Sequence, residues 1–188
     1  MLNSLSSKEQ MAEAGLLLAK RFISANSIVA PFIDIHYFKR PKSGCGYYSN
    51  NMIVVYVKAT AAIGKSGQAW SYPGYAIDRT AYGVIQHELG HHVDKLAGWK
   101  LSSRVRKLSG EKPLTGYAPD DAEWFAEMFR LFCTNPSLLR LIRPKTYAVL
   151  REQFESVEKR GWRNVLFDAP KRTLSQSLKK ISAAKNKQ

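Results

Sequence analysis

Several residue types are scarce in this chain of 188 residues, and each shortage excludes a class of protein. Two cysteines, Cys45 and Cys133, are too few for a disulfide-rich scaffold, and their spacing fits no zinc knuckle. A single disulfide between them is the alternative, but we expect two reduced, partly buried thiols. No apolar run approaches the ~18 residues of a membrane span, and the opening MLNSLSSKEQ lacks the pattern of a signal peptide. We therefore expect a cytoplasmic protein without a membrane span, in which histidine and carboxylate hold any metal.

Acidic residues are also scarce, since 15 Asp and Glu face 29 Lys and Arg and leave a net charge of +14. Such a charge attracts nucleic acid or an anionic surface. It is uneven, because residues 171–188 contain six Lys or Arg and no acid. The hydrophobic content of 45% is that of a folded protein. We expect one domain over residues 1–170 and a basic tail over residues 171–188.

The residue pattern predicts an α+β fold. β-branched and aromatic residues favour strands at 32–38 and 52–57, joined by a turn-rich connector at 39–51. Residues 59–79 form a glycine-bearing loop of a length that is often functional. Helices are expected in five places: from a capping box at residues 6–9 through 15–23, then at 80–97, from 119 to before 135, at 137–142 and at 146–160.

Residues 82–98, YGVIQHELGHHVDKLAG, hold three of the four histidines. On a helical projection, His87 and His91 share a face one turn apart, ~5–6 Å between Cβ atoms, so both imidazoles can bind one ion. Glu88 lies beside them and can reach a water without being a ligand. This is the HExxH pattern of zinc hydrolases. His92 falls within the core-facing stripe and is expected to be structural; the stripe is formed by Tyr82, Ile85, Leu89, Val93 and Leu96.

A third ligand is expected from the stretch DDAEWFAEMFR, residues 120–130. Glu123 and Glu127 share one face of this helix, opposite a broad apolar face. One carboxylate can ligate zinc while the other accepts the Nδ1–H of a ligating histidine, which orients the ring. A solvated face with a Glu127–Arg130 pair is the alternative interpretation.

HELGH, followed 32 residues after its second histidine by EWFAEMFR, resembles the gluzincin metallopeptidases, especially the anthrax lethal factor catalytic domain and the Pro-Pro endopeptidases. The run FRLFCTNPSLLRLIRPKTY is also similar to metallopeptidases inferred from bacteriophage genomes. The resemblance implies a small zincin-like domain, with a short β-sheet packed on helices, and a zinc-dependent metalloendopeptidase. It implies one Zn²⁺ bound by His87, His91 and Glu123, with Glu88 as general base and Glu127 supporting a histidine. Tyr117 would stabilise the oxyanion, or be a packing residue.

In the resembled families a strand before the metal helix pairs with extended substrate. Here that strand would be the segment Ile53, Val54, Val55 and Tyr56, unless it is an ordinary internal strand. Trp70, Tyr72 and Tyr75 in the long loop would shape a substrate pocket, or pack on the surface.

Two other function classes stay open. One is a basic nucleic-acid-binding or phage structural protein with a structural metal site, although no DNA-reading signature is present. The other is a zinc hydrolase that acts on a bond outside polypeptides, because the metal chemistry does not select the amide.

Overall fold

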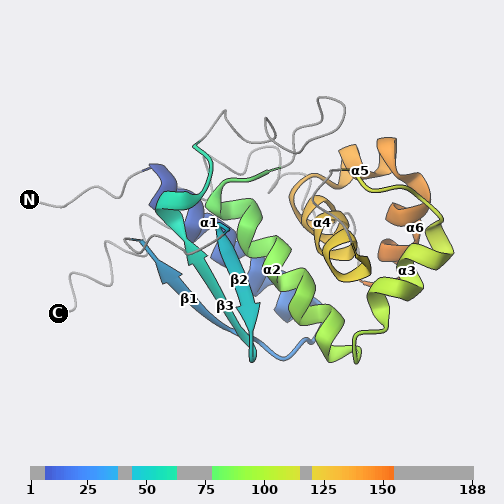
Figure 1. The fold of residues 1–188 in the computed structure, drawn as a ribbon, viewed down its shortest axis with the longest axis horizontal. Helices are drawn as coiled ribbons and strands as arrows, with labels where there is room; N and C mark the ends of the chain where they lie inside the picture. Colours follow the sequence, from blue (N-terminus) through green and yellow to red (C-terminus); the bar gives the residue numbers. More distant parts are fainter. Residues whose placement is uncertain (1–6, 38–43, 63–77, 115–119, 155–188) are drawn as a thin grey trace, which may run out of the picture.

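A computed structural model describes residues 7–37, 44–62, 78–114 and 120–154 (Figure 1). These residues form an α+β fold in which a small sheet lies against a group of helices, as predicted in outline. In chain order the elements are α1 (Ser7–Ala25), β1 (Phe32–His36), β2 (Gly46–Ser49), β3 (Met52–Tyr56), the 3-10 helix η1 (Val57–Ala59), α2 (Ala81–Leu96), α3 (Leu101–Ser109), α4 (Asp121–Thr134), α5 (Pro136–Ile142) and α6 (Pro144–Gln153).

The sheet has the strand order β1-β3-β2, so β3 lies in the middle. β1 runs parallel to β3, and β2 runs antiparallel to it. The β2–β3 turn consists of Asn50 and Asn51, with φ of 48° and 62°. Asparagine tolerates this left-handed region well, and two such residues make the tight hairpin turn that matches the twist of the strands.

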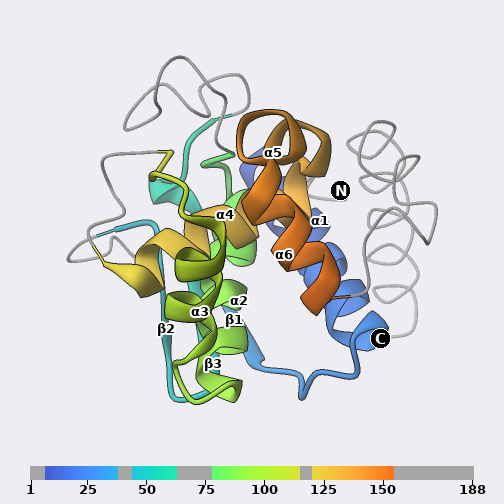
Figure 2. The same ribbon diagram turned by 90° about the vertical axis from the view of Figure 1, so that its right-hand side faces the viewer.

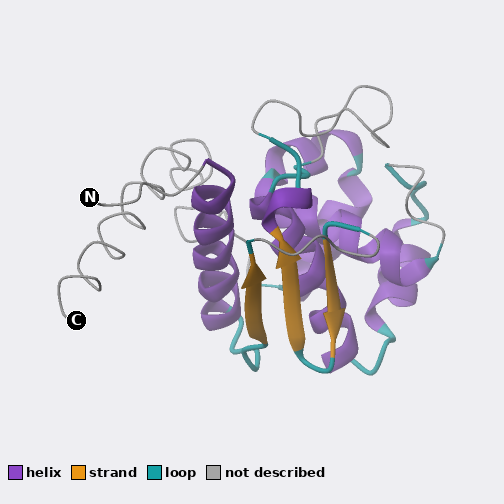
Figure 3. Cartoon of the chain, turned by 60° about the vertical axis from the view of Figure 1, so that its left-hand side comes forward, coloured by secondary structure: helices purple, strands orange, loops and turns teal. Residues whose placement is uncertain are grey.

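α2 is the centre of the helical layer. It packs against α1 and α4 and also against β2 and β3. Figure 2 shows the molecule from the side of α3, α5 and α6, and Figure 3 shows it with helices behind the sheet and to one side of it. Gln86 on α2 donates a buried hydrogen bond of 2.7 Å to the carbonyl of Gly15 on α1. The core between the layers is aromatic and aliphatic, and its largest fully buried side chains are Trp124, Phe22, Phe125, Phe129, Phe132, Ile53, Ile85, Leu89, Leu114, Met128 and Leu131.

Local sequence signals explain where the helices begin. Asp120 caps α4, because its carboxylate accepts a hydrogen bond of 2.8 Å from the backbone N–H of Glu123. α5 and α6 each start with proline, which is favoured in the first turn because its missing N–H would have no partner there. Within the described residues, no helix combines the length and apolar character needed to cross a bilayer.

Three sequence predictions need correction. The connector predicted at 39–51 contains β2, and no helix was predicted where α3 lies. Leu96, placed in the core stripe of α2, is 48% exposed because it lies in the last turn, beyond the contact with the sheet. Cys45 and Cys133 are free thiols, as expected.

Candidate metal centre

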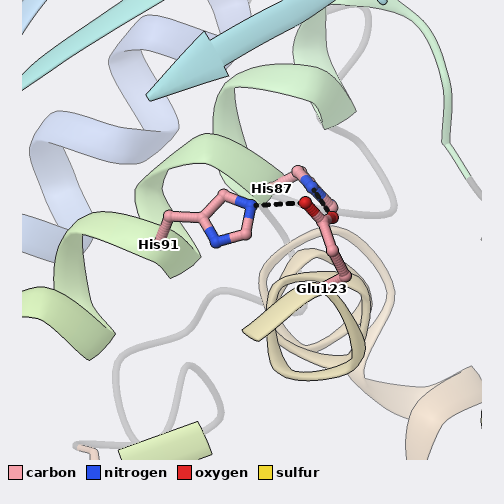
Figure 4. A group of neighbouring side chains, drawn as sticks. All are labelled: His87, His91 and Glu123. Atoms are coloured by element: carbon pink, nitrogen blue, oxygen red, sulfur yellow. Dashed lines mark hydrogen bonds and ion pairs between the residues drawn. The ribbon is translucent and has the colours of Figure 1, made fainter. Parts of the chain in front are cut away.

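His87 and His91 project from one face of α2 towards the first turn of α4 (Figure 4). Their rings lie one helical turn apart, with centroids 4.9 Å from each other and planes at 85°. Glu123 completes the group from α4. Its Oε2 lies 3.1 Å from His87 Nε2, and its Oε1 lies 3.6 Å from His91 Nε2.

The spacing of these three side chains suits an ion with tetrahedral coordination. One donor atom from each residue lies within 4.8 Å of the others. Ligand atoms placed ~2.0–2.2 Å from a tetrahedral zinc ion are about 3.3–3.6 Å apart. The two histidine–glutamate separations, 3.1 and 3.6 Å, lie close to that range. Two imidazoles and one carboxylate are also a donor set typical of catalytic zinc, which keeps a fourth position open.

Glycine at position 90 brings the two helices close enough for this geometry. A Cβ at Gly90 would lie 3.0 Å from the Cα of Ala126 and 3.3 Å from the Cβ of Phe129. These contacts are tighter than ordinary van der Waals packing, so a larger residue at position 90 would push α4 away from α2. Gly90, the second of the two variable residues in HExxH, therefore sets the distance between the two histidines and Glu123.

Glu127 contacts the Nδ1 side of the His87 ring, away from Glu123. Its side chain is 1% exposed, and its Oε1 lies 2.9 Å from His87 Nδ1. The Arg130 guanidinium donates a hydrogen bond to the same oxygen. Burial raises the pKa of Glu127, but Arg130 and His87 outweigh burial and hold it well below its usual range. Glu127 thus contacts His87, as expected of a residue that orients a histidine ring. It also forms the ion pair with Arg130 of the alternative interpretation, but that pair is buried and not solvated.

The charges of the group are strongly coupled. Burial lowers the pKa of His87, but hydrogen bonds with Glu123 and Glu127 outweigh burial and raise it to about 9. Burial raises the pKa of the Glu123 carboxyl, but its hydrogen bonds with His87 and His91 lower it to about 2. Without an ion, these shifts favour a protonated His87 imidazole beside the ionised carboxylates of Glu123 and Glu127. A divalent cation would replace that proton.

Glu88 lies next to the group, with 6% of its surface exposed. Burial raises the pKa of Glu88, against a smaller lowering by His87 and His91. A raised pKa suits a residue that accepts and returns a proton near neutral pH. Gly46 lies close to it, because a Cβ there would be 2.8 Å from the Val54 carbonyl and 3.2 Å from Glu88 Oε1.

His92 has a structural environment and lies outside the group. Its Nε2 donates to the carbonyl of Val29 at 2.8 Å, and its Nδ1 lies 3.0 Å from the Tyr48 hydroxyl. Burial lowers the pKa of His92, which favours the neutral ring. This histidine connects α2 to β2 and to the segment after α1.

The predicted strand addition to Ile53, Val54, Val55 and Tyr56 is wrong. β3 pairs with β1 on one edge and β2 on the other, so it has no edge for a further strand. The first three of these residues are fully buried. Tyr117, Trp70, Tyr72 and Tyr75 lie outside the described residues, as does the basic tail at 171–188.

A cavity of about 460 Å³ opens beside His87 and Glu88. The sequence does not indicate this cavity, because its walls come from segments that are far apart in the chain and carry no motif. The arginines that line it, Arg79 and Arg130, precede α2 and lie within α4. The other lining residues are Gly44, Cys45, Gly46, Ala59, Thr60, Ala61, Val84 and Glu127.

No family model matches the chain, and a search of curated proteins finds no match either. The function of the protein is therefore inferred from the geometry of the centre and from the chemistry of its side chains.

Proposed function

We propose that this protein is a zinc-dependent metallopeptidase of the gluzincin type, with a zincin-like fold. The observation that carries the proposal is the convergence of His87, His91 and Glu123 from two helices at separations suited to one ion. The HExxH order, with a buried glutamate between the histidines, supports hydrolysis over a purely structural ion.

Each side chain has a role in this proposal. His87, His91 and Glu123 would hold the zinc ion, and Glu127 would keep the Nδ1–H of His87 in place so that Nε2 faces the ion. The chemistry that bound zinc supplies is Lewis acidity, which polarises a peptide carbonyl and lowers the pKa of water to about 7. Glu88 would take a proton from the attacking water on its carboxylate and then transfer it to the leaving amine.

β2 is the strand best placed to bind an extended peptide. Within the described part of the chain it pairs only with β3, so its second edge carries no strand. Gly46, the first residue of β2, lies close to the carboxylate of Glu88. A peptide paired along this edge would pass beside the proposed catalytic base.

The test is metal content and peptide cleavage, measured on purified wild type and two variants. Glu88→Gln should keep the zinc and lose hydrolysis by a factor of at least ~100, the scale of general base catalysis. Glu123→Ala should lose most of the zinc, because two histidines then bind without a charged partner. Full cleavage by Glu88→Gln would refute the base assignment, and wild-type zinc content in Glu123→Ala would refute the ligand set.

A further inference from the structure

The cavity beside the metal centre contains two arginines besides its acidic side chains. Arg79 and Arg130 are its cations, and Glu88 and Glu127 are its anions. Both acids already have roles, since Glu127 pairs with Arg130 and His87, and Glu88 is the proposed base. A divalent ion with Glu123 as its one charged ligand would add one net positive charge next to the cavity.

Arg130 can bind an anion in the cavity. Its side chain is 5% exposed, and one of its terminal nitrogens is held by Glu127. Its Nε is buried and has no hydrogen-bond partner among the described residues. A buried guanidinium N–H without a partner is unfavourable, and a carboxylate is its best partner because the fork of N–H groups matches two oxygens.

Arg79 also lines the cavity, from the segment that precedes α2. Its backbone is held by a hydrogen bond of 3.0 Å from the N–H of Ala61 to its carbonyl. Cys45 lines the same cavity, and burial raises the pKa of its thiol while the charges of Arg79 and Arg130 lower it. Both guanidinium groups therefore act on the same wall of the cavity.

We propose that this cavity binds a carboxylate of the substrate, so that the enzyme selects peptides with an acidic group at the residue next to the scissile bond. The inference rests on the proposed peptidase function. His87 and Glu88 line both the cavity and the centre. A substrate group in the cavity would therefore lie next to the peptide bond that Glu88 is proposed to help hydrolyse. Its volume of about 460 Å³ accommodates one side chain or one terminal residue. The carboxylate belongs either to an Asp or Glu side chain or to the C-terminus of the peptide.

The first experiment compares peptides that differ only by Glu or Gln, each with a free or an amidated C-terminus. The zinc-loaded full chain should cleave the carboxylate-bearing member roughly 10–100 times better in kcat/KM, the scale of a charge-assisted hydrogen bond. Arg79→Gln should reduce that ratio about tenfold or more. The matched control is Arg104→Gln, which removes an exposed arginine of α3 outside the cavity and should leave the ratio unchanged. The Glu/Gln pair reports on a side-chain carboxylate, and the acid/amide pair reports on the C-terminus.

The second experiment measures binding without cleavage. Zinc-loaded Glu88→Gln is titrated by calorimetry with N-acetylglutamate α-amide, with N-acetylglutamine, and with N-acetylglutamine amide, which has no carboxylate. Binding of either acid that is at least tenfold tighter than binding of the amide, and is lost in Glu88→Gln/Arg79→Gln, supports the proposal. Arg130→Met is the second variant, and its thermal unfolding shows whether the fold survives the loss of the Glu127 pair.

The two proposals fail in distinguishable ways. If zinc binds but no peptide is cleaved, the peptidase function is refuted, and the calorimetry alone decides whether the cavity binds a carboxylate. If peptides are cleaved without preference for a carboxylate, or the preference survives in Arg79→Gln, the cavity proposal is overturned and the peptidase function stands.

Discussion

Replacing Gly90 by alanine tests whether the spacing of α2 and α4 controls metal binding. The new Cβ would lie 3.0 Å from the Cα of Ala126 and 3.4 Å from its Cβ. Carbon atoms pack best at ~3.5–4.0 Å, so the helices must separate by about 0.5 Å. Ligand distances in a zinc site tolerate only ~0.2 Å. We expect Gly90→Ala to bind zinc about tenfold more weakly, the lower end of the ~10–100-fold range seen when the support of a ligand is disturbed.

The same substitution should change stability much less. An extra methyl group in a packed core costs ~1–3 kcal/mol, but alanine is better than glycine inside a helix by about 1 kcal/mol. The free energy of unfolding of the metal-free protein should therefore fall by no more than ~2 kcal/mol.

Gly98→Ala is the matched control for Gly90→Ala. Gly98 has φ of 66° and no atom within 4 Å of a Cβ at that position. The control should lose ~1 kcal/mol through backbone strain alone and bind zinc like wild type. The assays are competition with a chromophoric chelator for affinity and urea unfolding for stability. Wild-type zinc affinity in Gly90→Ala would show that the helix spacing is not what places Glu123.

Three further predictions concern neighbouring groups. Glu127→Gln should lower zinc affinity by ~10–100-fold in chelator competition, because the amide supports the Nδ1–H of His87 less well than a carboxylate does. An affinity equal to wild type would remove Glu127 from the centre. Gly46→Ala should lower the free energy of unfolding by ~1–3 kcal/mol in urea and reduce hydrolysis more than zinc content, because the Cβ meets the Val54 carbonyl at 2.8 Å and the region of Glu88. Unchanged hydrolysis would contradict that dependence. In metal-free protein the pKa of His87 is raised to about 9, above its unfolded value of ~6.5, so its contribution to stability is complete below pH ~6.5 and is lost as the pH rises through about 9. Urea midpoints of wild type should fall over this range more steeply than those of His87→Gln, and equal slopes would refute the coupling.

The helices of the centre were predictable because their signals are local. His87 and His91 lie four residues apart with a glutamate between them, a spacing that has meaning only on a helix. Asp120 before Glu123 is a helix-capping signal that the structure uses. What the sequence could not provide is the separation between the helices, which depends on the contact of Gly90 with Ala126.

The errors lie where structure depends on tertiary contacts. β2 is four residues long and begins with glycine, so its composition resembles that of a turn. Its strand conformation comes from pairing with β3 across the Asn50–Asn51 turn. The interior position of β3 was one of two alternatives that the sequence left open, because the residues of one strand do not determine which strands pair with it. The arginines of the cavity carry no motif, and they meet only because α4 packs beside the segment that precedes α2.

The position of the three proposed metal ligands has a consequence for the lifetime of the protein. They join two helices that are otherwise connected through 31 intervening residues between His91 and Glu123, a stretch that includes α3. An ion at their centre would close this stretch into a ring, as a crosslink does, and would stabilise the folded chain in proportion to the logarithm of the free ion concentration. Shortage of zinc in the surroundings would then shorten the time that the protein survives unfolding and degradation, in addition to stopping the proposed hydrolysis.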